Sequence, residues 1–322
     1  MKILSRRLAV LVALAIAVVS FPALAQYPNK PIRLVLQFPA GGIADAVARI
    51  VAQPLSQALG QPVIVENRPG ADGAIAGETV MKAAPDGYTL LLATNSTLSA
   101  VPTLRKNPPY DPVADFSPIS MVGRFSFFVF TRPGLQAKAL SELVDLARAN
   151  PGKLNYGTGN TTSILATAQL KSLAGIDMVQ VPYKGDAPAT TDLLGGRVDL
   201  VIASTVPGLA LAKEGKIGAL ATLLSRRSSH LPDVPTMAEA GFPKYSVSSW
   251  AGIFGPAKLP RPIVERLTRE INAILQRPEV KDQLDRQAFE GESSTPEELG
   301  AFVKEQLEVW RRSVREAGIQ QE

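Results

Sequence analysis

The 322-residue sequence contains no cysteine and a single histidine, His230. Without cysteine the chain forms no disulfide and offers no thiolate ligand to zinc or to an iron–sulfur cluster. One histidine excludes a metal site built on several imidazoles. The sequence also lacks the phosphate-binding G-x-x-x-x-G-K-[ST] motif and the dinucleotide-binding G-x-G-x-x-G motif. We therefore expect neither a metal ion nor a cofactor.

Long apolar runs are absent except at the amino terminus. There a short basic stretch precedes apolar residues 8–21, and Ala23-Leu24-Ala25 fits a signal-peptidase site. This pattern predicts a secretory signal peptide over residues 1–25, with a mature chain that starts at Gln26. The apolar run is shorter than the roughly 20 residues of a membrane span, and a lipid anchor needs a cysteine. We expect an exported, periplasmic protein that is not inserted in the membrane after processing.

An excess of charge of one sign is also missing. Removal of the leader takes away three of the 34 basic residues and none of the 29 acidic ones, which leaves a net charge of +2. No block of lysine and arginine stands out, which argues against nucleic acid as a partner. The 297 residues that remain are enough for about two domains of ~150 residues each.

Signs of catalysis are scarce. His230 lies in the loop-like segment RRSSHLPDVP, where we expect a surface imidazole. A Ser–His–Asp hydrolase would have to use this histidine, yet no G-x-S-x-G nucleophile turn occurs. The spacing of the acidic residues marks no general acid–base pair. We expect no catalytic residue and no enzyme activity, and an exported hydrolase or isomerase is the least supported of the alternatives.

Strand-like and helix-like segments alternate along the chain. The first strand-like segments are 32–38, 62–67 and 87–94, and a second series begins at 127 and continues through 153–158, 178–183, 197–204 and 217–224. Helical patterns lie between them, and this alternation predicts parallel sheets with right-handed crossovers. Pro54 should kink or shorten the first helix, and Asp186 is expected to cap the helix over 187–194.

The last third of the chain is helical. A capping box, Thr295 to Glu298, precedes a long amphipathic helix in which Trp310 is expected to be buried. We place these helices back on the first domain, so that the chain crosses between domains twice, and we expect Trp250 to pack at a crossing. The prediction is an α/β fold of two domains, 26–124 with 253–322 and 125–252, each a mainly parallel sheet flanked by helices.

The segment FPAGGIAD, residues 38–45, joins the first strand to the first helix. Its glycines permit a close approach to the backbone, and the first N–H groups of the helix, near residues 42–44, have no carbonyl partner within it. Such amides suit a carboxylate, although the glycines also fit a simple tight turn. Asp45 either complements the helix dipole or accepts a hydrogen bond from water or ligand.

Polar residues follow other strands in the same way. Ligands of open parallel sheets sit at the carboxyl ends of strands, so we expect these loops to converge on one site. Lys184, next to them, is expected to be solvated. The candidate ligand-binding residues are Pro39, Ala40, Gly41, Gly42, Ile43, Ala44, Asp45, Asn95, Ser96, Thr97, Thr158, Gly159, Asn160, Thr161, Thr162, Ser163, Tyr183, Ser204 and Thr205.

An ordered series of motifs extends over nearly the whole mature chain. It includes YPNKPIRLV, FPAGGIADAVAR, LGQPVIVENRPGADG, PDGYTLLLAT, YDPVADFSPIS, VPYKGDAPATTDLLGGRVDL and LPDVPTMAEAGFP. With this set the chain resembles the Bug-type (TctC-like) periplasmic solute-binding receptors of tripartite tricarboxylate transporters. The resemblance implies a two-domain Venus-flytrap fold, similar to type II periplasmic binding proteins, with a hinge of two crossing segments.

The resemblance also implies a function. It predicts capture of a small organic carboxylate by the loops at 39–45 and 158–163 and its delivery to the membrane subunits of the transporter; a receptor that signals to a sensor kinase is the alternative. Ile43, Ala44 and Ile164 replace residues that in the family usually supply small, hydroxyl or imidazole groups, and the loop at 158–160 is about one residue shorter. These departures favour an aromatic or longer-chain carboxylate over a short polar diacid.

Overall fold

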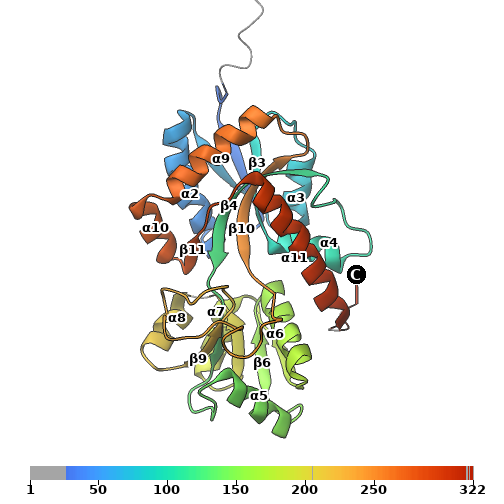
Figure 1. Ribbon diagram of the computed structural model, residues 1–322, viewed down its shortest axis with the longest axis vertical. Helices are drawn as coiled ribbons and strands as arrows, with labels where there is room; N and C mark the ends of the chain where they lie inside the picture. Colours follow the sequence, from blue (N-terminus) through green and yellow to red (C-terminus); the bar gives the residue numbers. More distant parts are fainter. Residues whose placement is uncertain (1–26, 205, 317, 319, 322) are drawn as a thin grey trace, which may run out of the picture.

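The computed structural model describes residues 27–204, 206–316, 318 and 320–321. The predicted signal peptide and the candidate residue Thr205 lie outside these residues. Within the described part of the chain, no helix has the length and apolar character needed to cross a membrane. The chain forms two lobes, one above the other in Figure 1, and each lobe has its own sheet.

The first lobe is built on a six-stranded mixed sheet. Across the sheet the order is β11-β4-β10-β3-β1-β2. β1 pairs in parallel with β2 and β3, whereas β10 is antiparallel to β3 and β4, and β11 is antiparallel to β4. The strands are β1 Ile32–Leu36, β2 Val63–Asn67, β3 Thr89–Thr94, β4 Phe116–Phe125, β10 Trp250–Pro256 and β11 Phe289–Gly291.

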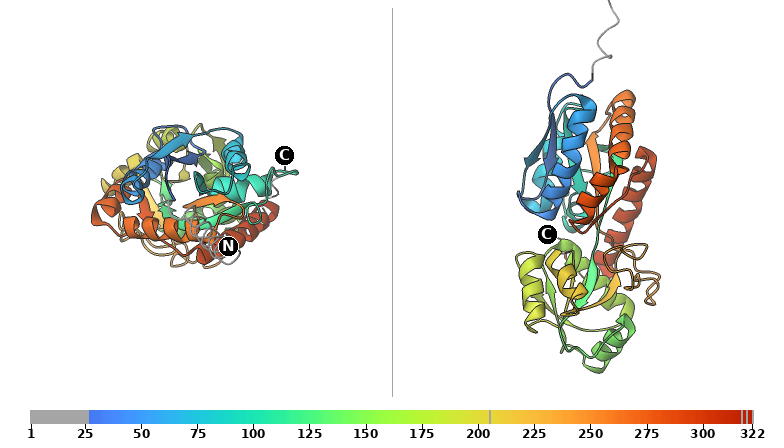
Figure 2. Two further views of the ribbon diagram at one scale, coloured as in Figure 1. Left: turned by 90° about the horizontal axis from the view of Figure 1, so that it is seen from above. Right: turned by 90° about the vertical axis from the view of Figure 1, so that its left-hand side faces the viewer.

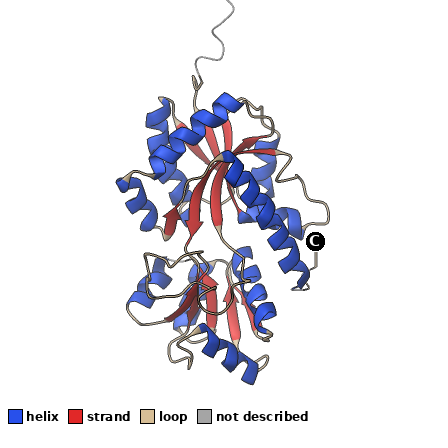
Figure 3. Ribbon diagram, in the orientation of Figure 1, coloured by secondary structure: helices blue, strands red, loops and turns tan. Residues whose placement is uncertain are grey.

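Helices cover both faces of this sheet (Figure 3). Alternate residues of β1 point to opposite faces, so that Leu34 and Leu36 pack with α2 while Val35 packs in a second cluster with α3 and α11. A strand buried on both sides reads as an apolar run, and β1 shows one from Leu34 to Leu36, after the exposed Arg33. The helices are α2 Ile43–Leu59, α3 Ala74–Met81, α4 Val101–Leu104, α9 Arg261–Leu275, α10 Pro278–Asp285 and α11 Pro296–Glu316, with short turns η1 Ala71–Gly73 and η2 Ser96–Ala100.

The second lobe repeats the arrangement of the first. Its order is β7-β6-β8-β5-β9, so that β7, β6 and β8 correspond to β2, β1 and β3. These three strands are parallel, and β5 is antiparallel to β8 and β9. The elements are β5 Phe128–Thr131, α5 Leu140–Ala149, β6 Asn155–Thr158, α6 Thr161–Ala174, β7 Val179–Pro182, α7 Asp186–Leu194, β8 Leu200–Ala203, α8 Val206–Lys213 and β9 Gly218–Thr222.

The predicted two-lobed α/β class is confirmed, but the sheets are mixed and not mainly parallel as predicted, for a topological reason. The chain enters each sheet from the other lobe, through β5 in one direction and β10 in the other. These entering strands oppose their neighbours. The exact domain boundaries, after residues 124 and 252, stay predictions; β4 runs to Phe125 and β10 starts at Trp250.

Local predictions for the helices had mixed outcomes. The capping box at Thr295 and Glu298 forms, and Trp310 is fully buried. Pro54, however, lies inside an uninterrupted α2 that continues to Leu59. Burial of Leu55 and Leu59 beyond the proline stabilises the last turn, because packing of an apolar face outweighs one missing helical hydrogen bond.

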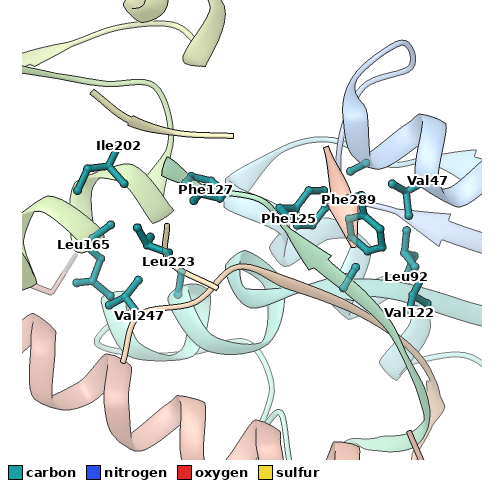
Figure 4. Close-up of a cluster of buried hydrophobic side chains, with 14 of the residues drawn as sticks. Val47, Leu92, Val122, Phe125, Phe127, Leu165, Ile202, Leu223, Val247 and Phe289 are labelled. Carbon is teal, nitrogen blue, oxygen red and sulfur yellow. The ribbon is translucent and has the colours of Figure 1, made fainter. Parts of the chain in front are cut away.

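The two lobes share a continuous apolar core at the hinge. Figure 4 shows Phe125 and Phe127, at the crossing between β4 and β5, between the apolar side chains of both lobes. Phe125 meets Phe289 edge-on, with ring centroids 4.8 Å apart. On the second-lobe side the same cluster contains Leu165, Ile202, Leu223 and Val247.

Polar contacts also join the lobes along the second crossing. Gln169 of α6 accepts hydrogen bonds from the backbone of Ser246 and Val247, and it reaches Ser313 of α11, which lies beside the hinge in Figure 2.

The prediction that His230 is a surface imidazole was wrong. Its side chain is only 8% exposed and lies 3.3 Å from the Asp285 carboxylate of α10, because the long loop after β9 folds back against the first lobe.

Candidate ligand-binding cleft

A cavity of about 520 Å³ lies between the lobes at the hinge. It is formed where β1, β3, β6, β7 and β8 end, which is the place where open α/β sheets hold ligands. The residues that line it are Phe38, Pro39, Gly41, Gly42, Ile43, Ala44, Thr94, Asn95, Ser96, Phe125, Phe127, Gly159, Asn160, Thr162, Gly185, Asp186, Ala187, Ser204, Val206, Pro207 and Ser249.

The first-lobe wall of the cavity is the start of α2. Gly42 caps this helix with an extended backbone and supplies no side-chain hydrogen bond. The first N–H groups of a helix have no carbonyl partner within it and carry a partial positive charge. At this wall the helix start therefore presents backbone donors to the cavity, and an anion is the partner that suits them.

Asp45 stabilises the start of α2 without lining the cavity. Its buried carboxylate accepts hydrogen bonds from the Gly41 backbone, from Arg49 and from Asn67. The side chain is 6% exposed and does not line the cavity. Its contacts are all internal, so the structure gives it a positioning role in the β1–α2 loop.

Asp45 should make the stability of the protein sensitive to acid. The hydrogen bond from Arg49, with those from Gly41 and Asn67, lowers its pKa from 3.8 to about 2. A lowered pKa stabilises the folded state above the unfolded value, and this contribution is lost as the pH falls through about 2. The wild type should lose free energy of unfolding as the pH falls from 5 to 2, and urea titrations measure this loss. In Asp45→Asn the loss should be smaller by on the order of 1 kcal/mol. Equal pH slopes in both proteins would contradict this role.

The second-lobe wall, at the start of α6, is arranged differently. The predicted polar loop is shorter than expected, because Thr161, Thr162 and Ser163 already form the first turn of α6. Asn160 accepts a hydrogen bond from the Ser163 backbone, and the Ser163 hydroxyl accepts from the backbone of Gly159 and Asn160. This reciprocal capping box occupies the backbone amides of Gly159, Asn160 and Ser163, so that fewer amides remain free for an anion at the start of α6.

The two helix starts are therefore not equivalent. α2 begins without a side-chain cap, whereas α6 caps itself. The loops at 39–45 and 158–163 were both predicted to hold the carboxylate. In the structure, more backbone donors are left uncapped at the α2 start, whereas side chains occupy part of the α6 start.

Asn95 joins the two walls. Its side chain is 1% exposed, and its Nδ2 donates a hydrogen bond of 2.7 Å to the Thr162 hydroxyl of the other lobe. Its Oδ1 accepts a hydrogen bond from Ser249, on the crossing segment before β10. One residue at the end of β3 thus links the first lobe, the second lobe and the hinge.

An acidic side chain lies on the second-lobe wall. Asp186, expected to be a helix cap, is instead the first residue of α7, and Gly185 occupies the capping position. Its carboxylate accepts hydrogen bonds from Asn160 Nδ2 at 2.8 Å and from the Ser204 backbone at 3.4 Å. Burial raises the pKa of the Asp186 carboxyl to about 7, against the lowering effect of these two hydrogen bonds.

The rest of the cavity wall is mostly apolar. Three phenylalanines, Phe38, Phe125 and Phe127, line it together with Ile43 and Val206. A pocket of this kind holds the carbon skeleton of a ligand, while a few polar groups fix its orientation.

The structure brings together most of the predicted site residues around the cavity. Thr158 accepts a hydrogen bond from Gln180, and Tyr183 donates its hydroxyl hydrogen to Asp192. Lys184 is exposed, as expected, and Trp250 packs against Phe254 and Phe302. The described candidates that do not line the cavity are Ala40, Asp45, Thr97, Thr158, Thr161, Ser163 and Tyr183.

Several lining residues were missed by sequence reasoning. Asp186 and its neighbours follow strand β7 and precede a helix, so the strand-end rule applied to them as well. Phe125 and Phe127 gave no such signal, because aromatic residues near a strand usually belong to the core. The missed residues are Phe38, Thr94, Phe125, Phe127, Gly185, Asp186, Ala187, Val206, Pro207 and Ser249.

This chain is similar along most of its length to several known proteins. BugT of Bordetella pertussis is 38% identical over 98% of both chains. A Rhodopseudomonas palustris structure with adipate is 32% identical, with a TM-score of 0.78 over 91% of this chain and 99% of the other. MatC of the same species, with bound malate, is 30% identical, with a TM-score of 0.74 over 89% of this chain and 100% of the other.

The family match covers most of the chain. Residues 47–319 match the model of the tripartite tricarboxylate transporter family receptor, named TctC. This range includes every strand after β1 and every loop of the cavity except the one that opens α2. The chain therefore belongs to the TctC family of tripartite tricarboxylate transporter receptors.

Proposed function

We propose that this protein is a periplasmic receptor that captures a small organic carboxylate between its lobes and delivers it to the membrane subunits of a tripartite tricarboxylate transporter. The main support is the cavity, in which an uncapped helix start faces an apolar chamber at the hinge. The related structures with adipate and malate support a carboxylate as the ligand.

The polar and apolar parts of the cavity suggest how the ligand lies. The carboxylate meets the backbone amides at the start of α2, where each hydrogen bond to a charged acceptor contributes about 1.5–3 kcal/mol. The carbon skeleton lies against the phenylalanines. Micromolar affinity corresponds to about −8 kcal/mol, so the amides supply part of it and apolar burial supplies the rest.

Calorimetric titration with matched carboxylates tests this proposal. Benzoate, hexanoate, adipate and malate should include at least one ligand of micromolar affinity, whereas the corresponding neutral amides should bind at least about tenfold more weakly, because they lack the anion that the α2 amides favour. Binding of neutral amides as tightly as of carboxylates, or binding of sugars alone, would contradict the proposal.

A cavity-filling variant identifies the site. A Cβ atom at Gly42 meets only the Pro39 carbonyl oxygen, at 3.9 Å, so Gly42→Val should fold normally. Because Gly42 lines the cavity, the valine methyl groups should occupy ligand space and weaken binding at least about tenfold. Gly60→Ala, at the far end of α2 with nothing within 4 Å of a Cβ atom, is the control for a loss of stability: its left-handed φ of 68° strains alanine by about 1 kcal/mol without changing the cavity.

The role after capture requires a separate experiment. Loss of uptake of the bound carboxylate in a deletion strain supports delivery to a transporter. Unchanged uptake with a lost transcriptional response supports a receptor for a sensor kinase. We infer a non-catalytic receptor, and conversion of the bound ligand by purified protein would contradict that inference.

A further inference from the structure

Asp186 is an unusual residue for the wall of a carboxylate site. Among the described residues that line the cavity, it is the one titratable side chain. α7 packs against β6, β8 and α8. The titratable or charged side chains of these elements and of α7 are Tyr156, Lys213, Asp186 and Asp192, with Lys184 in the preceding loop and Asp45 on the opposite helix. Within the described chain, none of the other five side chains forms a hydrogen bond or ion pair with the Asp186 carboxylate.

The contacts of this carboxylate leave accepting capacity unused. Oδ1 accepts from Asn160, and Oδ2 has only the long 3.4 Å contact with the Ser204 backbone. Each carboxylate oxygen has two lone pairs available for hydrogen bonds. The Ser204 hydroxyl, in the same wall, is buried and has no partner among the described residues. Together these groups form a polar spot in an otherwise apolar wall.

The position of Asp186 is fixed by its surroundings. Gly159 packs directly against Gly185 and Asp186, without space for a Cβ atom. The Asp186 carboxylate is also tied to Asn160, whose own side chain is held in the α6 capping box. A rotation of Asp186 out of the cavity therefore breaks contacts within the second lobe.

We propose that Asp186 selects the ligand by requiring a hydrogen-bond donor, a hydroxyl or ammonium group, at the end opposite the carboxylate that α2 holds. This inference rests on the proposed function, because it takes that carboxylate as given. An ionised Asp186 accepts hydrogen bonds from such a donor, with the unpartnered Ser204 hydroxyl beside it. A second carboxylate at this end would face a like charge.

The protonation state of Asp186 also determines the pH at which a dicarboxylate binds. Once protonated, its carboxyl group becomes a donor and accommodates a second carboxylate. Since burial raises the pKa of Asp186 to about 7, the protonated form dominates at pH 6.0 and the ionised form at pH 8.5. The preference for donor-ended ligands is therefore strongest in alkaline solution.

Four ligands with the same six-carbon chain test the proposal by calorimetry at pH 8.5. These are hexanoate, 6-hydroxyhexanoate, 6-aminohexanoate and adipate. The hydroxyl- and ammonium-ended ligands should bind about tenfold or more tightly than adipate and hexanoate. Lowering the pH to 6.0 should strengthen adipate binding about tenfold and leave hexanoate binding unchanged.

Asp186→Asn removes the charge and keeps the size of the side chain. It should abolish both the preference for donor-ended ligands and the pH dependence of adipate binding. The matched control is Asp145→Asn, the same change in the same lobe at a side chain that is 76% exposed; it should behave as the wild type. Thermal unfolding of both variants shows whether they are folded.

The outcomes separate the two proposals. If adipate binds at pH 8.5 as tightly as 6-aminohexanoate, or if Asp186→Asn retains the wild-type order of affinities, the inference about Asp186 is overturned while the carboxylate receptor stands. If none of the four carboxylates binds, and none of those in the earlier titrations does, both proposals are overturned.

Discussion

Gly159→Ala is expected to weaken ligand binding about 100-fold, which corresponds to about 2.8 kcal/mol. A Cβ atom at this position would overlap the Gly185 carbonyl carbon and lie 2.5 Å from both the backbone nitrogen and Oδ1 of Asp186. The contact is with backbone, which cannot move aside as a flexible side chain does. The start of α7 must therefore shift, and with it the part of the wall that carries Asp186.

The same substitution should lower stability less than it lowers affinity. Overpacking typically costs 1–3 kcal/mol, which a domain tolerates, whereas the cavity wall has to match the ligand closely. Urea unfolding and calorimetry on the same preparation measure the two effects. A variant with wild-type affinity would show that the contact between Gly159 and α7 does not shape the site.

Gly175→Ala is the control for Gly159→Ala. Gly175 ends α6 in a left-handed conformation, with φ of 61° and nothing within 4 Å of a Cβ atom. Alanine there is strained by about 1 kcal/mol but touches nothing near the cavity. Its affinity should equal that of the wild type, which separates backbone strain from damage to the site.

Trp250→Ala should destabilise the protein by about 3–5 kcal/mol, a large part of a typical total of 5–15 kcal/mol. Trp250 is fully buried in β10 and meets the Phe302 ring of α11 edge-on, with centroids 5.5 Å apart. Its loss opens a cavity between the central strand and the long C-terminal helix. The midpoint of urea unfolding measures the effect.

Trp250→Phe is expected to cost far less, about 1 kcal/mol. The indole Nε1 is buried without a partner among the described residues, and an unpaired buried donor is itself unfavourable. Phenylalanine loses some packing but removes this donor, so the two effects partly cancel. If phenylalanine is as damaging as alanine, the indole N–H has a partner, such as a bound water, that stabilises the fold.

The elements of the fold were predictable because their signals are local. Strand β1 and helix α2 follow from an apolar run and from an apolar face of period 3.6, and the C-terminal helix follows from its capping box. The errors came where packing overrode a local signal. Pro54 is kept inside α2 by the burial of Leu55 and Leu59, and His230 is buried by a loop that returns to the first lobe.

The site was predictable only in part, for a related reason. The rule that ligands lie at strand ends located the loops around Gly42 and Asn160 correctly in one cavity. It gave no information on which backbone amides remain free, since that depends on the side-chain rotamers of Asn160 and Ser163. The unequal roles of the two helix starts therefore emerged only from the hydrogen bonds.

The amino-acid order by itself determined the family, the two α/β lobes and the loops that open onto the cavity, because each depends on patterns within a short stretch of chain. Only the tertiary structure decided that Asp186 and Phe127 line one cavity and that Asn95 reaches Thr162, 67 residues away. Contacts between distant segments depend on how whole sheets twist and pack together, and no short-range pattern encodes that geometry.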